Sequence, residues 1–217
     1  MKKTIIAFVL CLLMMGCVTT STLKFVPQAL NGQETISKDG VEAVVSQKKA
    51  RVTVQPAAGT YTSQDRPTIA VSVYGGEETF NFSTEDIQVF VDGNPHRIIP
   101  YDELVEEIEN REKRELSRLK LENDKRREGA GGSADLAYRV EQEYNSDVAD
   151  VKREKKQAIR ALDATMLKKT TVSPHEECSG HVTMEKIPNP AQPHEVKVVV
   201  RAAGEEHEFL LKHLQVH

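Results

Sequence analysis

The chain has 217 residues, of which 39% are hydrophobic and only 5% are aromatic. Its 29 basic and 33 acidic side chains give a formal net charge of −4 at pH 7. This balance argues against a nucleic-acid-binding protein, because binding to phosphates needs clustered lysine and arginine. The length is enough for one domain with an appendage, and the core must be aliphatic since the chain has no tryptophan.

The chain starts with the segment MKKTIIAFVLCLLMMGC, which has the layout of a secretion signal. Lys2 and Lys3 precede an apolar run that is too short to span a bilayer as a mature helix. Gly16 then precedes Cys17, and this ending resembles the lipobox of bacterial lipoprotein signal peptides. The resemblance implies that residues 1–16 are removed and that Cys17 is acylated. No cofactor other than this covalent lipid is expected.

Removal of the signal leaves 27 of the 29 basic residues against 33 acidic ones, a net charge of −6. Cys178 is then the only cysteine besides Cys17, so no intrachain disulfide is expected. The chain has no polybasic segment, and the acyl chains must therefore provide the membrane attachment. Val18, in place of Asp, resembles the pattern of lipoproteins that are sorted outward. It predicts a lipid anchor in the outer membrane, with the protein on the periplasmic face.

Residues 17–37 contain many Thr, Ser, Gln and Asn residues without a clear apolar period, which predicts a flexible tether after Cys17. Over residues 38–100 apolar and polar residues alternate, which predicts short β-strands bounded by turn sequences such as Asp92-Gly93. The alternation returns over residues 170–217, where three valines fall on one face of a strand: Val196, Val198 and Val200.

Residues 101–169, between these two β segments, have a different pattern. The runs Tyr101–Glu128 and Ser133–Lys169 contain no proline and no internal glycine, and Gly129–Gly132 separates them. This predicts two long antiparallel helices joined by a glycine turn, an arm that could project roughly 40 Å. Apolar or small residues recur at near-heptad spacing in the second run: Ala137, Val140, Tyr144, Val148, Val151, Ala158 and Leu162.

Polar residues interrupt the apolar stripe of both predicted helices. Arg111 and Glu112 break it in the first, and Lys155 breaks it in the second. Each break is expected to leave the contact between the helices incompletely packed. The hairpin is therefore suited to binding a partner or to self-association.

Three segments of the β-rich parts carry turn and core patterns: Arg66–Val73, Phe80–Ile87 and Thr171–Val182. With them, these parts resemble small bacterial immunoglobulin-like lipoprotein domains of the telokin-like type, over about 115 residues and without any catalytic motif. The expected fold is mainly β with an α insertion. It is an immunoglobulin-like antiparallel β-sandwich, discontinuous over 38–100 and 170–217, because three C-terminal strands are too few to stand alone.

One motif could hold a metal ion, namely His175-x-x-Cys178-x-x-His181. Thiolate and imidazole ligands at such spacing suit a soft or borderline metal, with His194 or His207 as a fourth ligand. Two other interpretations stay open: an exposed loop with incidental histidines, and a redox or intermolecular role for Cys178. The metal interpretation makes the alternative function a metal- or small-ligand-binding envelope protein.

No pattern in the chain predicts an enzyme. The glutamates of the helical runs alternate with Lys and Arg, as on a solvated face with i,i+4 pairs. No Gly-x-Ser-x-Gly elbow exists, and Gly129–Gly132 lacks the Lys-Ser/Thr of a phosphate loop. We therefore expect a binding or scaffolding protein for another envelope component. Its contact residues on the hairpin are expected to be Arg118, Glu122, Arg153 and Lys156, unless the hairpin folds back over a sheet edge.

Overall fold

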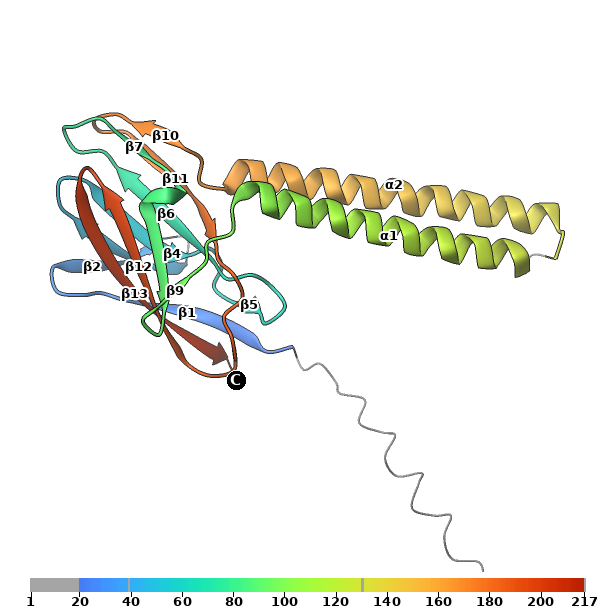
Figure 1. Cartoon of the computed structure of the whole chain (residues 1–217), viewed down its shortest axis with the longest axis horizontal. Helices are drawn as coiled ribbons and strands as arrows, with labels where there is room; N and C mark the ends of the chain where they lie inside the picture. Colours follow the sequence, from blue (N-terminus) through green and yellow to red (C-terminus); the bar gives the residue numbers. More distant parts are fainter. Residues whose placement is uncertain (1–19, 39, 130, 217) are drawn as a thin grey trace, which may run out of the picture.

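The computed structural model describes residues 20–38, 40–129 and 131–216. The predicted signal peptide 1–16 and Cys17 lie outside the described residues. Two antiparallel β-sheets and a two-stranded ribbon form a β domain, and two long helices leave it together as a hairpin (Figure 1). The prediction of a mainly β fold with two inserted helices is confirmed.

The larger sheet has six strands in the order β5-β1-β13-β12-β8-β9, and all neighbours are antiparallel. In that order the strands are β5 (Tyr61–Thr62), β1 (Thr22–Gln28), β13 (Glu205–Val216), β12 (His194–Ala202), β8 (Ile87–Val91) and β9 (Asn94–His96). Asp92 at the β8–β9 turn has a φ of 50°, followed by Gly93 at 79°. Two successive left-handed residues match the twist of a tight hairpin, as the Asp-Gly sequence predicts.

The second sheet has five strands in the order β11-β6-β4-β3-β2. They are β11 (Glu177–Thr183), β6 (Thr68–Tyr74), β4 (Arg51–Pro56), β3 (Val41–Gln47) and β2 (Gln33–Lys38). The ribbon pairs β7 (Phe80–Phe82) with β10 (Thr170–Val172), and a short 3-10 turn, η1 (Thr84–Asp86), leads into β8. Strands from before and after the helices are neighbours in both sheets, since β6 pairs with β11 and β8 with β12.

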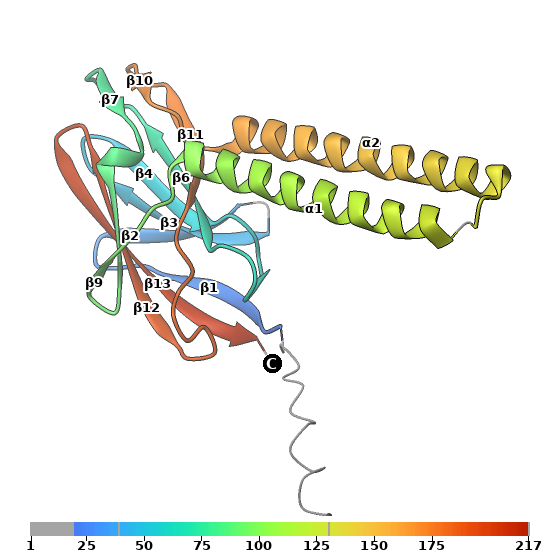
Figure 2. The same ribbon diagram turned by 45° about the vertical axis from the view of Figure 1, so that its right-hand side comes forward.

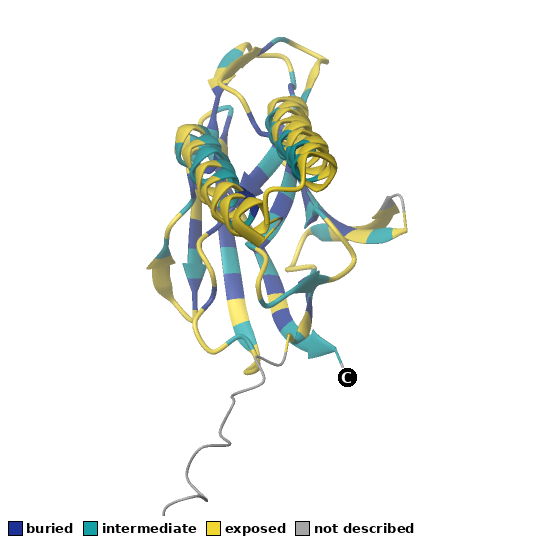
Figure 3. Ribbon diagram, turned by 90° about the vertical axis from the view of Figure 1, so that its right-hand side faces the viewer, coloured by how far each residue is buried: buried dark blue, intermediate teal, exposed yellow. Residues whose placement is uncertain are grey.

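The two sheets face each other across one aliphatic core. Every second side chain of β6 is turned inward, and Ile69, Val71 and Val73 are fully buried there. The six-stranded sheet supplies Val198 and Phe209 to the same cluster. Figure 3 shows the burial concentrated in the strands, whereas the helices are mostly exposed or intermediate. Each fully buried side chain of this kind contributes about 1.5–3 kcal/mol, so the core can stabilise the β domain. Cys178, the cysteine in the described residues, forms no disulfide there.

The prediction of a flexible tether over residues 17–37 is wrong from Thr22 onward. Strand β1 lies between β5 and β13, with a register that runs from Thr22 opposite Val216 to Gln28 opposite Leu210. Its inward side chains, Leu23 and Phe25, are buried. The local composition is polar enough to resemble a linker. The pairing that makes it a strand involves residues from the other end of the chain, which a local pattern does not reveal.

The hairpin consists of α1 (Tyr101–Gly129) and α2 (Ala134–Thr165). At about 1.5 Å per residue, α1 is about 43 Å long. Both helices point away from the β domain and cover neither sheet (Figure 2). Gly131 and Gly132, with φ of 58° and 83°, supply the left-handed backbone of the connecting turn. In the part of the chain that the structure describes, no helix is long and apolar enough to cross a membrane.

Candidate functional site

The base of the hairpin is fixed to the β domain by a small apolar cluster. Ile99, Leu104 and Met166 are buried together, and Tyr101 and Leu162 pack against them. These residues come from the chain just before α1, from the first turns of α1 and from the end of α2. The cluster therefore holds both helices at the point where they leave the β domain.

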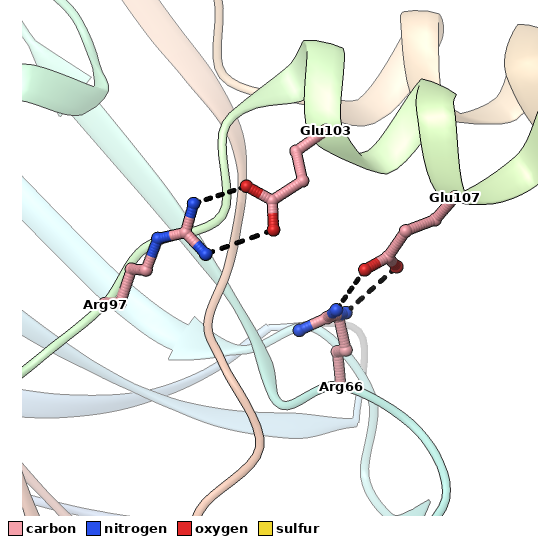
Figure 4. A network of polar contacts seen from close by, with 4 residues as sticks. All are labelled: Arg66, Arg97, Glu103 and Glu107. Atoms are coloured by element: carbon pink, nitrogen blue, oxygen red, sulfur yellow. Dashed lines mark hydrogen bonds and ion pairs between the residues drawn. The ribbon is translucent and has the colours of Figure 1, made fainter.

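Two ion pairs add to this attachment, as Figure 4 shows. Arg66, which precedes β6, donates from two nitrogens to the carboxylate of Glu107 on α1. Arg97, which precedes α1, makes a second two-pronged contact with Glu103, one arm of which measures 3.1 Å. Two-pronged guanidinium–carboxylate pairs fix orientation as well as distance. They set the direction in which the hairpin projects.

The return of the chain from α2 depends on Gly180 in β11. A Cβ atom at this position would lie 2.4 Å from the Cα of Leu167, which is too close for any other residue type. The amide of Leu167 donates to the carbonyl of His181, and the Leu167 side chain enters the core. Gly180 thus allows the segment after α2 to lie directly on β11.

The polar breaks of the two helices face each other. Lys155 of α2 reaches across to α1, with its Nζ 2.8 Å from Glu112 Oε2 and 3.5 Å from Glu109 Oε1. The hydrogen bond to Glu112 raises the pKa of Lys155 above its usual value. The expectation that these breaks leave the seam incompletely packed is therefore wrong at this level. The polar residue of one helix forms a salt bridge with the polar residue of the other.

Little of the hairpin is nevertheless buried. None of the residues of α2, all of which the structure describes, is buried, and α1 buries Leu104, Leu119 and Asn123. The side-chain oxygen of Asn123 has no hydrogen-bond partner within the described residues. Two helices without a third element cannot enclose an apolar seam on all sides. One side of the seam remains open.

The open side is a groove of about 530 Å³ along the middle of the hairpin. Its floor is apolar and consists of Ile108 and Leu119 of α1 and Val151 and Ala158 of α2. Its rims are charged. The acidic residues among its lining are Glu112, Glu115, Glu122, Asp147, Asp150 and Glu154.

Three cations line the groove against these six carboxylates, which gives the lining a net charge of −3. Two of them are already paired, since Lys155 contacts Glu112 and Arg118 contacts both Glu115 and Glu122. Hydrogen bonds from Arg118 lower the pKa of Glu115 below its usual value. Arg111 is the third. The groove therefore presents an acidic surface around an apolar floor.

The predicted contact residues of the hairpin fall into three groups. Arg118 and Glu122 line the groove, where the Nη1 of Arg118 lies 2.6 Å from Glu122 Oε1. Arg153 lies beside it and pairs with Asp150 at 2.8 Å. Lys156 is exposed and does not line the groove. It is two positions after Glu154, and residues two positions apart lie on nearly opposite sides of a helix.

The acidic residues of the groove rim on α2 are not among the predicted contact residues. Asp147, Asp150 and Glu154 follow one another at steps of three and four, the same spacing as the apolar stripe beside them. This second stripe is visible in the sequence. The apolar period, which predicts the hairpin, does not by itself point to it.

The structure does not bring His175, Cys178 and His181 together as a metal site. Cys178 and His181 lie three positions apart in β11, so their side chains point to opposite faces of the sheet. Cys178 packs against the core, and His175 lies in the preceding turn, with its ring centroid 6.4 Å from that of Tyr74. Among the described residues, no three His, Cys, Asp or Glu side chains are arranged to hold a metal ion.

The two histidines considered as a fourth ligand belong to other surroundings. The Nδ1 of His194 lies 2.7 Å from Asp92 Oδ2, and the Nδ1 of His207 lies 3.0 Å from the hydroxyl of Ser46. His207 is fully buried in the larger sheet. Both side chains serve the packing and hydrogen bonding of the β domain.

No family model, no curated protein and no solved structure matches the chain.

Proposed function

We propose that this protein is a lipid-anchored protein of the outer membrane that binds another envelope protein through its helical hairpin, on the periplasmic side. One observation carries the proposal: the hairpin projects from the β domain and leaves an apolar groove uncovered along its middle. A helix pair that served only the stability of the domain would place its apolar stripe on a sheet. Here the stripe is available to a partner instead.

The short distance between Cys17 and the β domain supports a scaffolding role. Strand β1 begins at Thr22, five positions after Cys17. An extended chain spans at most about 3.6 Å per residue, so the anchor would hold the β domain within about 18 Å of the acyl chains. The β domain then serves as a fixed base, and the hairpin presents its groove at a defined distance from the membrane.

For the β domain we propose an immunoglobulin-like sandwich. The support is the pair of antiparallel sheets, which face each other across a single core with alternate side chains turned inward. This arrangement is common among modules that present a binding surface on a rigid frame. The fold by itself implies no activity.

The test is photo-crosslinking in cells from positions on the hairpin. A photoreactive residue at Arg153, beside the groove, is expected to capture one specific envelope protein, whereas the same residue at Lys186 on the β domain is not. Deletion of residues 108–159, joined by a short Gly/Ser loop, keeps Glu103, Glu107 and the apolar cluster at the base. This shortened protein, which lacks position 153, is expected to fold and no longer to co-purify with the protein that the full-length hairpin captures.

The anchor is tested separately with the variant Cys17→Ala. The wild type is expected to incorporate labelled palmitate and to sediment with outer membranes, and the variant is expected to do neither. A wild type that is recovered without lipid, or a shortened hairpin that still co-purifies with the captured protein, would contradict the proposal.

A further inference from the structure

We infer that the groove of the hairpin binds a cationic amphipathic helix of its partner, which completes a three-helix bundle. The inference rests on the proposed function and specifies the partner's chemistry. The floor of the groove is an apolar stripe on each helix. Ile108 and Leu119 are eleven positions apart on α1, and Val151 and Ala158 are seven apart on α2, so each pair lies close to a whole number of turns apart on one face.

The shape of the groove favours a helix over an extended segment. From Ile108 to Glu122 it follows the hairpin for about 21 Å, roughly four helical turns. A helix satisfies its own backbone hydrogen bonds and can lay an apolar stripe on such a floor. An extended segment would find no strand edge between two helices, and its backbone groups would lose their water without a replacement.

The charges on the rims determine the sign of the charge that a partner must carry. Six carboxylates against three cations leave the lining with a net charge of −3. Within the described residues, Asp147 and Glu154 form no ion pair, so two carboxylates of α2 are free to meet lysine or arginine. Cations along both flanks of an apolar stripe are therefore complementary to the groove.

The same charges argue against other occupants. A two-fold dimer of this chain would place the groove against itself, with carboxylates opposite carboxylates. Anionic lipid headgroups and nucleic-acid phosphates would be repelled for the same reason. The exposed Leu121, Leu136 and Tyr138 lie outside the groove lining, toward the far end of the hairpin, and the inference does not depend on them.

Binding of a designed peptide to the purified full-length protein in neutral detergent tests the inference. The probe is a peptide of about 15 residues with Leu and Ala on one stripe and Lys on both flanks. Its controls are a scrambled peptide and a peptide with Glu in place of Lys. We expect the Lys helix alone to bind, and we expect its affinity to fall as salt is raised.

A matched pair of variants locates the site. Asp147→Lys with Glu154→Lys reverses two groove charges without breaking an ion pair of the hairpin, and should weaken peptide binding at least about tenfold. Asp124→Lys with Glu128→Lys makes the same change in net charge at exposed positions outside the groove lining, and should leave the affinity within about twofold. Equal weakening by both pairs, or binding of the scrambled peptide, would overturn the inference.

Crosslinking in cells distinguishes this inference from the function on which it rests. If the hairpin captures a partner and the Asp147→Lys/Glu154→Lys variant captures it equally well, the proposed function stands and the groove is not the binding site. If no position on the hairpin captures a partner, the proposed function itself fails. Sedimentation that shows a groove-dependent dimer would also overturn the inference, because it would identify a second copy as the occupant.

Discussion

His213 is a buried histidine whose ring nitrogens both lack a hydrogen-bond partner within the described residues. Its ring lies among Phe25, Tyr61 and His194, with centroid distances of 5.5 to 5.9 Å within that group. Burial lowers the pKa of His213 to about 4, and the charge of His194 acts in the same direction. The fold therefore favours the neutral ring.

This gives a prediction for stability against pH. The unfolded chain takes up a proton at His213 near pH 6.5, whereas the folded protein does so only near pH 4, so the fold loses stability as the pH falls between these values. Between pH 6.5 and 5 we expect the free energy of unfolding to drop by about 1.6 kcal/mol through this residue. Urea unfolding at several pH values measures the effect.

The control for this prediction is His213→Phe, which fits an aromatic pocket and does not titrate. Its stability should change much less over the same interval than that of the wild type. Burial also lowers the pKa of His207. At His194 burial acts in the same direction, but the hydrogen bonds with Asp92 and with the backbone at Asn189, together with the charge of Asp92, outweigh it, and the pKa is raised. His207 and His194 contribute to the pH dependence of the free energy of unfolding with opposite signs, and both are present in the wild type and in the variant. A wild type and a variant with the same pH profile would refute the assignment to His213.

At the level of the helices, the salt bridge of Lys155 is the feature most open to test. The side chain of Glu112 is only 14% exposed, so removal of its partner leaves a largely buried charge. We predict that Lys155→Leu lowers the melting temperature of the hairpin, and that Glu112→Leu added to it restores or raises that temperature. Thermal unfolding followed by helical circular dichroism measures both.

Lys155→Leu alone and Glu112→Leu alone should therefore together destabilise the hairpin by more than the double variant does. If each single substitution and the double substitution destabilise in simple sum, the two side chains do not interact, and the polar breaks are independent defects. The hairpin would then be underpacked at both positions, as the sequence suggests when each helix is considered alone.

The helices illustrate which features can be predicted from this sequence. Two runs without proline or internal glycine predict α1 and α2 and their antiparallel connection. The salt bridge of Lys155 with Glu112 could not be predicted in the same way, because it depends on the register between the helices. Gly180 could be recognised only as part of a turn and core pattern. A glycine is required there because the backbone of Leu167 lies directly against it, and this contact is known only from the three-dimensional structure.

Across the whole molecule, the pairing of strands far apart in sequence is hardest to predict. The pairing of β1 with β13 adds β1 and β5 to the larger sheet and brings together the two ends of the described chain. The acidic rim of the groove similarly combines stripes from two helices. In both cases the local sequence contains the necessary residues. Whether they form a strand or a groove depends on a neighbouring element that the sequence alone does not identify.

The position of β1 determines how far the chain can be shortened at its N-terminal end. A soluble chain that begins at Thr20 should fold, whereas one that begins at Gln28 should be strongly destabilised. The shorter chain loses the buried Leu23 and Phe25, each worth about 1.5–3 kcal/mol, and exposes the edges of β5 and β13. Phe25→Ala in the longer chain keeps the backbone pairing and should cost about 3–5 kcal/mol. Thermal unfolding compares the three proteins. Equal melting temperatures for the two chain lengths would mean that residues 20–27 are a tether after all, and that the anchor at Cys17 does not hold the β domain close to the membrane.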